Sequence, residues 1–149
     1  CDYFEPSALS IFYINAGKTA FLMNNGPQMA WYLDKAAIAL DQFDSFWKKP
    51  VLEALRALHA FQLNDFETAL KHLKRSVDCV NTINNPRDIG MVYFAQAMVR
   101  KGLETDPRIN LPDMTEFLSK PSGIYFFEAL KHLDPYRDRA EIEYLRKLM

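Results

Sequence analysis

The stretch LRALHAFQLNDFETAL, residues 55–70, decides the fold. On both sides of its centre, apolar side chains recur every three or four residues, which is the spacing of an amphipathic helix. Asn64-Asp65 interrupts this pattern, and Asp65 is a residue type that caps the start of a following helix. The stretch therefore predicts two helices joined by a tight turn, which is a helical hairpin.

Helical spacing continues outward from this hairpin through most of the chain, with interruptions rich in Asn, Gly and Pro. The first predicted helix begins at a cap on Ser7 and ends at Asn24-Asn25-Gly26-Pro27. Further helices are predicted over residues 27–43, 52–61, 66–80, 88–103, 123–133 and 136–148, with a short helical turn near 113–118. We therefore expect an all-α fold of stacked antiparallel hairpins, about three of them, followed by a C-terminal helix.

Length and charge narrow the class of protein further. A chain of 149 residues suits one domain, expected over residues 8–149, with residues 1–7 as an N-terminal anchor or linker and a long loop at 104–120. Its 18 basic and 19 acidic residues form no basic patch, so a nucleic acid is not the expected partner. The longest apolar stretch, near residues 89–99, is shorter than the roughly 20 residues of a transmembrane helix.

Two internal repetitions point to a repeat architecture. The pentapeptide ALKHL occurs at residues 69–73 and again at 129–133, each time in the second helix of an expected hairpin. Small residues expected at helix contacts recur at equal intervals along the chain, at Gly17, Ala57 and Ala97. The central hairpin resembles a tetratricopeptide (TPR) repeat, in which a turn like Asn64-Asp65-Phe66 joins two closely packed helices. The period of that family, about 34 residues, is shorter than the spacing from Gly17 to Ala57 or from Ala57 to Ala97. The resemblance therefore implies a TPR-like α/α repeat with longer helices.

In TPR arrays the first helix of each hairpin lines a concave face, so the resemblance implies a groove for a partner or a segment of this chain. Six apolar residues are expected to line it: Ile14, Phe21, Leu58, Phe61, Phe94 and Met98. Lys18 and Lys101 are the charged residues aligned with them. Because exposed apolar patches of this size are uncommon, either the C-terminal helix or residues 104–120 fill the groove, or another protein does.

If the chain fills its own groove, binding is expected on outer surfaces instead. The aromatic residues expected to be exposed there are Tyr3, Phe4, Tyr125 and Tyr136. Either arrangement predicts that the partners are other protein subunits.

The first residue, Cys1, suggests how the chain is located. A mature chain that begins with cysteine resembles a bacterial lipoprotein, and this resemblance implies a lipid on Cys1 that holds the domain at the periplasmic side of a membrane. Stable anchoring of this kind needs two or more acyl chains. The alternative is that Cys1 only marks where this piece of chain starts, as a soluble cytoplasmic domain.

No motif in the sequence predicts catalysis, a metal or a cofactor. His59, His72 and His132 show no spacing suited to a metal and are expected at helix surfaces or edges, and the isolated glycines form no phosphate loop. We therefore expect a non-catalytic helical-repeat adaptor or scaffold, an accessory or assembly subunit of a membrane-associated complex. The alternative is a carrier or sensor of a small hydrophobic ligand, with a pocket between hairpins that the 104–120 loop covers. The long loop and the abundance of aromatic residues, among them Tyr93, Phe94 and Tyr125, favour this alternative.

Overall fold

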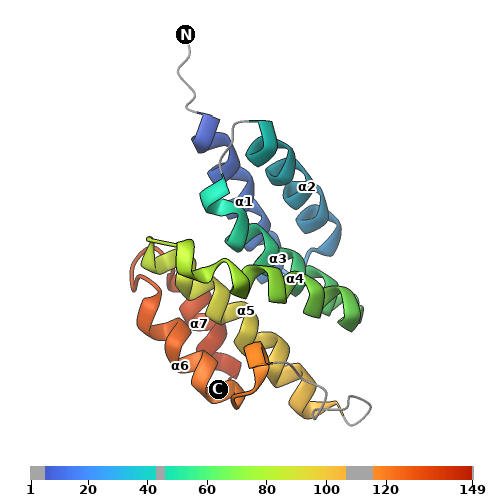
Figure 1. Cartoon of the computed structure of the whole chain (residues 1–149), viewed down its shortest axis with the longest axis vertical. Helices are drawn as coiled ribbons and strands as arrows, with labels where there is room; N and C mark the ends of the chain where they lie inside the picture. Colours follow the sequence, from blue (N-terminus) through green and yellow to red (C-terminus); the bar gives the residue numbers. More distant parts are fainter. Residues whose placement is uncertain (1–5, 43–45, 107–115, 149) are drawn as a thin grey trace.

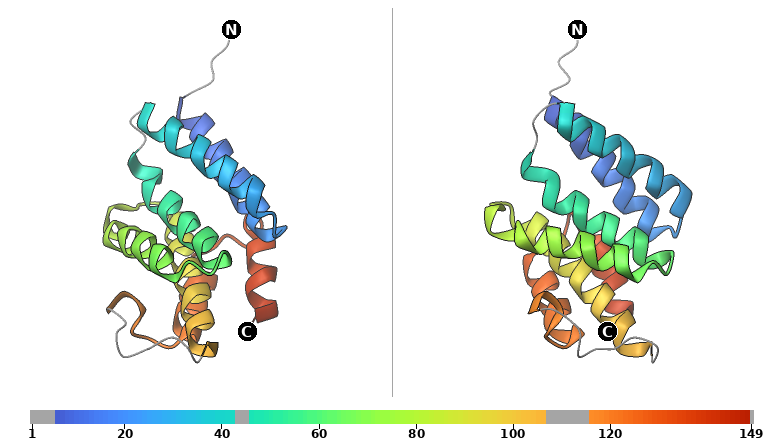
Figure 2. Two further views of the ribbon diagram at one scale, coloured as in Figure 1. Left: turned by 90° about the vertical axis from the view of Figure 1, so that its right-hand side faces the viewer. Right: turned by 45° about the vertical axis from the view of Figure 1, so that its right-hand side comes forward.

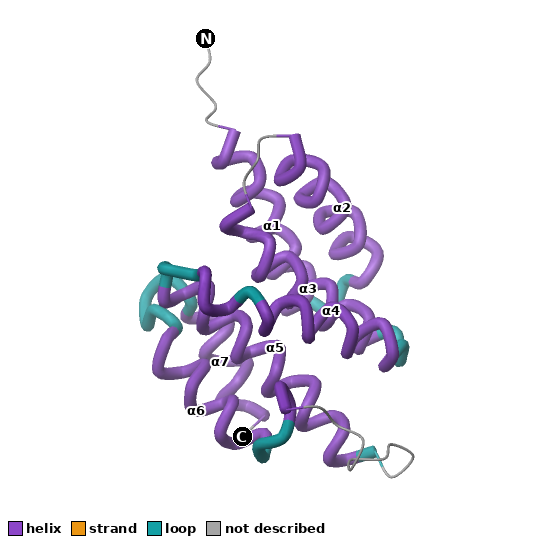
Figure 3. Tube along the Cα trace, in the orientation of Figure 1, coloured by secondary structure: helices purple, strands orange, loops and turns teal. Residues whose placement is uncertain are grey.

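The computed structural model describes residues 6–42, 46–106 and 116–148, and within these ranges the chain folds into helices without a strand (Figure 3). The expected all-α fold is therefore confirmed. The α-helices are α1 (Pro6–Leu22), α2 (Gly26–Gln42), α3 (Lys49–Gln62), α4 (Phe66–Asp78), α5 (Pro86–Thr105), α6 (Ser122–His132) and α7 (Arg139–Leu148). Short 3₁₀ helices are η1 (Phe46–Lys48), η2 (Val80–Thr82) and η4 (Glu116–Leu118).

The helices pair as α1–α2, α3–α4 and α5–α6, and α7 follows as a single helix. Helix α3 packs against both helices of the first hairpin, and α5 packs against both helices of the second. This order of contacts is that of a stacked helical repeat, in which each unit buries the apolar face of its neighbour. The α1–α2 hairpin forms one end of the molecule and α6 lies at the other (Figure 1).

The turns of the first two hairpins have the same structure and occupy equivalent places in the repeat. Asn24 and Asn64 each adopt a left-handed backbone, with φ of 55° and 60°. The next amide in each turn donates a hydrogen bond to the carbonyl five residues earlier, Asn25 to Ala20 at 2.8 Å and Asp65 to Ala60 at 2.9 Å. This bond closes a helix C-terminus of the Schellman type. The two turns are separated by the same interval as Gly17 and Ala57, so the repeat in the sequence is a repeat of the structure as well.

Several boundaries differ from those expected. Helix α5 begins two residues early, because the Asn85 side chain accepts a hydrogen bond from the Arg87 amide, and it continues to Thr105 rather than ending near residue 103. The predicted loop at 104–120 is therefore shorter at its start, and most of it lies outside the described residues. Helix α7 begins at Arg139 rather than near residue 136, because Asp134 accepts two backbone amides and holds a turn before it.

Helix α5 is the central helix of the molecule and is buried on several sides. A Cβ atom on Gly90 would lie 2.8 Å from Leu133 Cδ2 and 3.2 Å from the Leu133 backbone nitrogen. A Cβ atom on Gly102, on another face of the same helix, would overlap the Phe61 ring. Both placements are closer than van der Waals contact. The two glycines therefore let the end of α6 and the ring from α3 approach the α5 backbone.

A buried ion pair joins the second hairpin to the third. The Lys48 ammonium lies 2.9 Å from both carboxylate oxygens of Asp88, and both side chains are about nine-tenths buried. Asp88 also lies in the first turn of α5, where a negative charge interacts favourably with the helix dipole. The pair fixes the start of α5 against the segment that leads into α3.

We predict that Gly90→Ala lowers the free energy of unfolding by about 1–3 kcal/mol, because the added methyl overpacks the contact with Leu133. Gly123→Ala is the matched control, since a Cβ atom there meets nothing within 4 Å. The control is expected to gain a few tenths of a kcal/mol, up to about 1, from reduced backbone freedom in the unfolded chain. Urea denaturation measures both, and equal stabilities of the two variants would contradict the close approach.

Candidate functional site

Four of the six residues expected to line a groove are part of the core, and the other two are partly covered. Ile14, Phe21, Leu58 and Phe94 are buried, and Phe61 and Met98 are half-buried. The Tyr144 ring of α7 lies 5.5 Å from that of Phe21 and 6.0 Å from that of Phe94, measured between ring centroids. The Phe21 and Phe94 rings are themselves in edge-to-face contact at 5.9 Å. Helix α7 therefore packs on the residues that were expected to receive a partner.

Both lysines aligned with the groove interact with α7 or with the turn before it. The Lys101 ammonium donates a hydrogen bond to the Leu148 carbonyl oxygen near the end of α7. Lys18 of α1 is near Glu141 and Asp138. Burial lowers the pKa of Lys18, and these two carboxylates only partly compensate. The charge that we expected to be available to a partner is thus used within the chain.

Asp138 attaches the start of α7 to α5. Its carboxylate accepts a bidentate pair of hydrogen bonds from the Arg87 guanidinium, at 3.0 Å and 2.8 Å, and its backbone carbonyl accepts the Ile142 amide. Burial alone would raise the pKa of Asp138, but the bonds from Arg87 and from the Asp134 amide outweigh it and hold the pKa below its ordinary value. In the left-hand view of Figure 2, α7, drawn in red, stands below the turn of the α1–α2 hairpin.

The first hairpin carries a row of four rings, Phe12, Tyr13, Trp31 and Tyr32, which we term the aromatic surface. Phe12 and Trp31 are exposed, whereas Tyr13 and Tyr32 are half-buried against the core. Phe12 is 57% exposed and Trp31 is 54% exposed, and each ring lies within 6.2 Å of the next in an edge-to-face arrangement. The Lys35 ammonium lies 5.2 Å from the centre of the Trp31 ring. The rings hold one another in place, so a partner would meet a surface that is already ordered.

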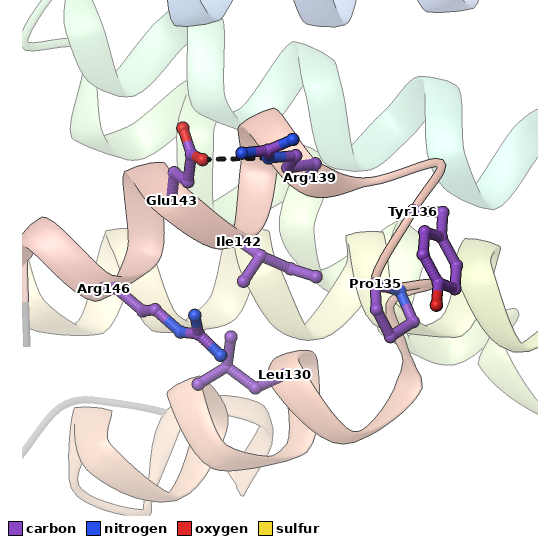
Figure 4. A pocket seen from close by; sticks show the side chains of 7 residues that line it. All are labelled: Leu130, Pro135, Tyr136, Arg139, Ile142, Glu143 and Arg146. Atoms are coloured by element: carbon purple, nitrogen blue, oxygen red, sulfur yellow. Dashed lines mark hydrogen bonds and ion pairs between the residues drawn. The ribbon is translucent and has the colours of Figure 1, made fainter.

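A cleft of about 430 Å³ lies between α6 and α7, on the outside of the molecule (Figure 4). Leu130 and Ile142 lie on its two sides, and the Arg146 guanidinium lies close to Leu130 in the view of Figure 4. Arg139 and Glu143 form an exposed ion pair at its rim, with 3.2 Å between Nε and Oε1. Tyr136 is 90% exposed beside it, as was expected from the sequence.

A smaller cleft of about 230 Å³ lies where η2, η4 and α5 meet. Tyr93, Phe117 and Tyr125 contribute rings to its lining. The expectation that Tyr125 is exposed is wrong, because its ring is buried and its hydroxyl donates a hydrogen bond to the Phe117 carbonyl. Tyr3 and Phe4, the other expected surface aromatics, lie outside the described residues, as does Cys1.

Two of the histidines expected at helix surfaces or edges, His72 and His132, contact other groups of the folded chain. His72 Nδ1 lies 2.6 Å from Glu53 Oε2, and both side chains are mostly buried. The ring of His132 stacks on that of Tyr93 at 5.4 Å, and its Nδ1 lies 2.8 Å from the Glu128 carbonyl. Sequence reasoning missed the Glu53–His72 pair. The signal that was available is the antiparallel pairing of α3 and α4, which brings the first turns of α3 beside the last turns of α4.

Over residues 6–42, 46–106 and 116–148, no group of three or more His, Cys, Asp or Glu side chains is arranged to hold a metal ion. In the same ranges, every helix is either too short or too polar for a membrane crossing. Comparisons with protein-family models, with curated proteins and with solved structures found no match.

We predict that Asp138→Asn lowers the free energy of unfolding at pH 7 by about 2 kcal/mol, less than for a fully buried pair because the Arg87 side chain is one-third exposed. Folding lowers the pKa of the Asp138 carboxyl. Its contribution to the free energy of unfolding is therefore complete above about pH 3.9, the pKa of an Asp side chain in the unfolded chain, and is lost as the pH falls through the lower pKa of the folded state.

The difference in stability between parent and variant should therefore shrink below about pH 4, as measured by urea unfolding across pH. The matched control is Glu143→Gln on α7, which removes a solvent-exposed ion pair and is expected to cost less than about 0.5 kcal/mol. If Glu143→Gln lowered the free energy of unfolding as much as Asp138→Asn does, the Arg87–Asp138 pair would not be what holds α7 against α5.

Proposed function

We propose that this chain is a non-catalytic helical-repeat adaptor, an accessory or assembly subunit of a membrane-associated protein complex. The observation that carries the proposal is the aromatic surface on the first hairpin. Tryptophan and tyrosine are enriched among the residues that contribute most to protein–protein binding, because they bury a large area with few rotatable bonds. Rings that already contact one another lose little side-chain entropy when a partner covers them.

The packing of α7 supports binding through outer surfaces. Tyr144 lies against Phe21 and Phe94, and Lys101 donates a hydrogen bond to the Leu148 carbonyl. A segment from another protein would have to displace these contacts before it reached the inner face. The exposed rings of the first hairpin need no such rearrangement, so they are the favoured docking surface.

The proposal includes an anchor at Cys1, on the periplasmic side of a bacterial membrane. Its support is the resemblance of a chain that starts with cysteine to a lipoprotein. Helix α1 begins at Pro6, so an anchored Cys1 would hold the first hairpin, and with it the aromatic surface, near the membrane. A soluble cytoplasmic domain is the alternative location.

A carrier of a small hydrophobic ligand is the second candidate function. The cleft of about 230 Å³ that Tyr93, Phe117 and Tyr125 line is the observation that favours it. Its volume is below the range of about 300–1,000 Å³ that is common for sites of small ligands. The adaptor therefore remains the better-supported proposal.

We predict that Trp31→Ala weakens binding of the partner protein by at least about tenfold, because it removes the ring at the middle of the aromatic surface. Trp47→Ala is the matched control: its ring is 48% exposed and also carries a lysine ammonium over its face, at 5.0 Å, but it lies on η1. The control should bind as the parent does.

Native mass spectrometry of chains purified from membranes measures this effect. A stoichiometric polypeptide that is retained by the parent and by Trp47→Ala, and lost from Trp31→Ala, is the expected outcome. Equal retention by both variants would remove the aromatic surface as the docking site. A co-purifying apolar small molecule in place of a polypeptide would favour the carrier.

A separate prediction concerns the anchor. The N-terminal peptide of the natively processed protein should carry the added mass of acyl chains on Cys1, and Cys1→Ser should move the protein from the membrane fraction to the soluble fraction. Intact-mass analysis of that peptide and fractionation of the two chains measure this. An unmodified thiol on natively processed protein would refute the anchor and leave the adaptor proposal standing.

A further inference from the structure

A third cleft, of about 260 Å³, lies between α2, α3 and α4 and has a strongly charged lining. Apolar side chains of α2 and α3 contribute part of its wall. Its charged and titratable residues come from all three helices: Asp41, Lys49, Glu53, Arg56, His72 and Arg75. None of these belongs to the aromatic surface or to the contacts that hold α7.

Two residues that line this cleft, Glu53 and His72, form a mostly buried pair. Glu53 is 9% exposed, and its carboxylate lies 2.6 Å from His72 Nδ1. A buried carboxylate is costly unless a hydrogen bond or an opposite charge compensates it, and His72 supplies that compensation. The negative charge of Glu53 is therefore already partnered, and Asp41, the other carboxylate of the lining, is exposed to solvent.

The cations of the cleft are largely uncommitted. Lys49 and Arg75 are exposed, and neither forms an ion pair or hydrogen bond with another residue of the described chain. Arg56 contacts Asp34 at 3.5 Å, a long distance to a carboxylate whose side chain is 72% exposed. Three cationic side chains thus face two carboxylates, Asp41 and Glu53, in the cleft, which is an excess of one positive charge.

We propose that this cleft binds the phosphate group of a small phosphorylated molecule. Arg56 and Arg75 approach from two different helices, and each guanidinium presents a planar fork of donors that matches phosphate oxygens. Lys49 adds a third positive charge on the same face of α3 as Arg56. His72, held by Glu53 at 2.6 Å, also lines the cleft.

The dimensions of the cleft limit the ligand. A volume of about 260 Å³ accommodates a phosphate with a few attached heavy atoms and is below the usual range for sites that hold drug-sized molecules. The ligand class is therefore a small phosphate monoester rather than a nucleotide. This site goes beyond the proposed adaptor function, and neither depends on the other.

Titration of the full chain with inorganic phosphate at constant ionic strength, followed by two-dimensional NMR, tests the proposal. Saturable shifts should be confined to α2, α3 and α4. Arg75→Gln and Lys49→Gln, which alter exposed side chains and leave the core intact, should each weaken binding about tenfold, the effect of losing one charge-assisted hydrogen bond.

Lys74→Gln is the matched control. Lys74 is on the same helix as Arg75 and its substitution changes the net charge equally, but its ammonium pairs with Asp78 at 2.8 Å outside the cleft. Binding by this variant should equal that of the parent. If Lys74→Gln and Arg75→Gln weakened phosphate binding equally, general electrostatic attraction would explain the effect and the proposed site would be refuted. The absence of saturable shifts in the parent would refute it as well.

Discussion

The stacking of Tyr144 against Phe21 and Phe94 is the contact on which the rest of the structure depends. It joins the first hairpin, the third hairpin and the C-terminal helix at one point, although these segments are far apart in the chain. An open array of three hairpins would leave the apolar inner face in water, and α7 removes that exposure. Because α7 covers this face, the proposed docking of a partner is placed on the outer surfaces.

Two adjacent residues at the start of α5 hold this arrangement in register. Arg87 pairs with Asp138 before α7, and Asp88 pairs with Lys48 before α3. Neighbouring positions on a helix point in directions about 100° apart, so the two pairs fix α5 relative to two different parts of the fold. Mutually packed helices of this kind present surface side chains at constant positions, which is the property that an adaptor and a small anion site both require.

The helices and most of their ends were predictable from the sequence, because the signals that set them are local. Asn24 and Asn64 adopt left-handed turns, and Asp65 caps α4, from interactions within four or five residues. The spacing of the repeat could be predicted for the same reason, because the equivalent turns at Asn24 and Asn64 are formed by similar short sequences. The start of α7 was misplaced because the turn at Asp134 competes with the helical pattern that follows it.

The sequence by itself thus determined the all-α class, the hairpins and the set of apolar residues that had to be covered. Only the tertiary structure decided that α7 covers Phe21 and Phe94, that Tyr125 turns inward to Phe117, and that Glu53 meets His72. Periodicity identifies which face of a helix is apolar but carries no information about which distant helix packs on it. That choice depends on the crossing of whole helices and on close contacts such as Gly90 with Leu133, which arise only when the chain is folded.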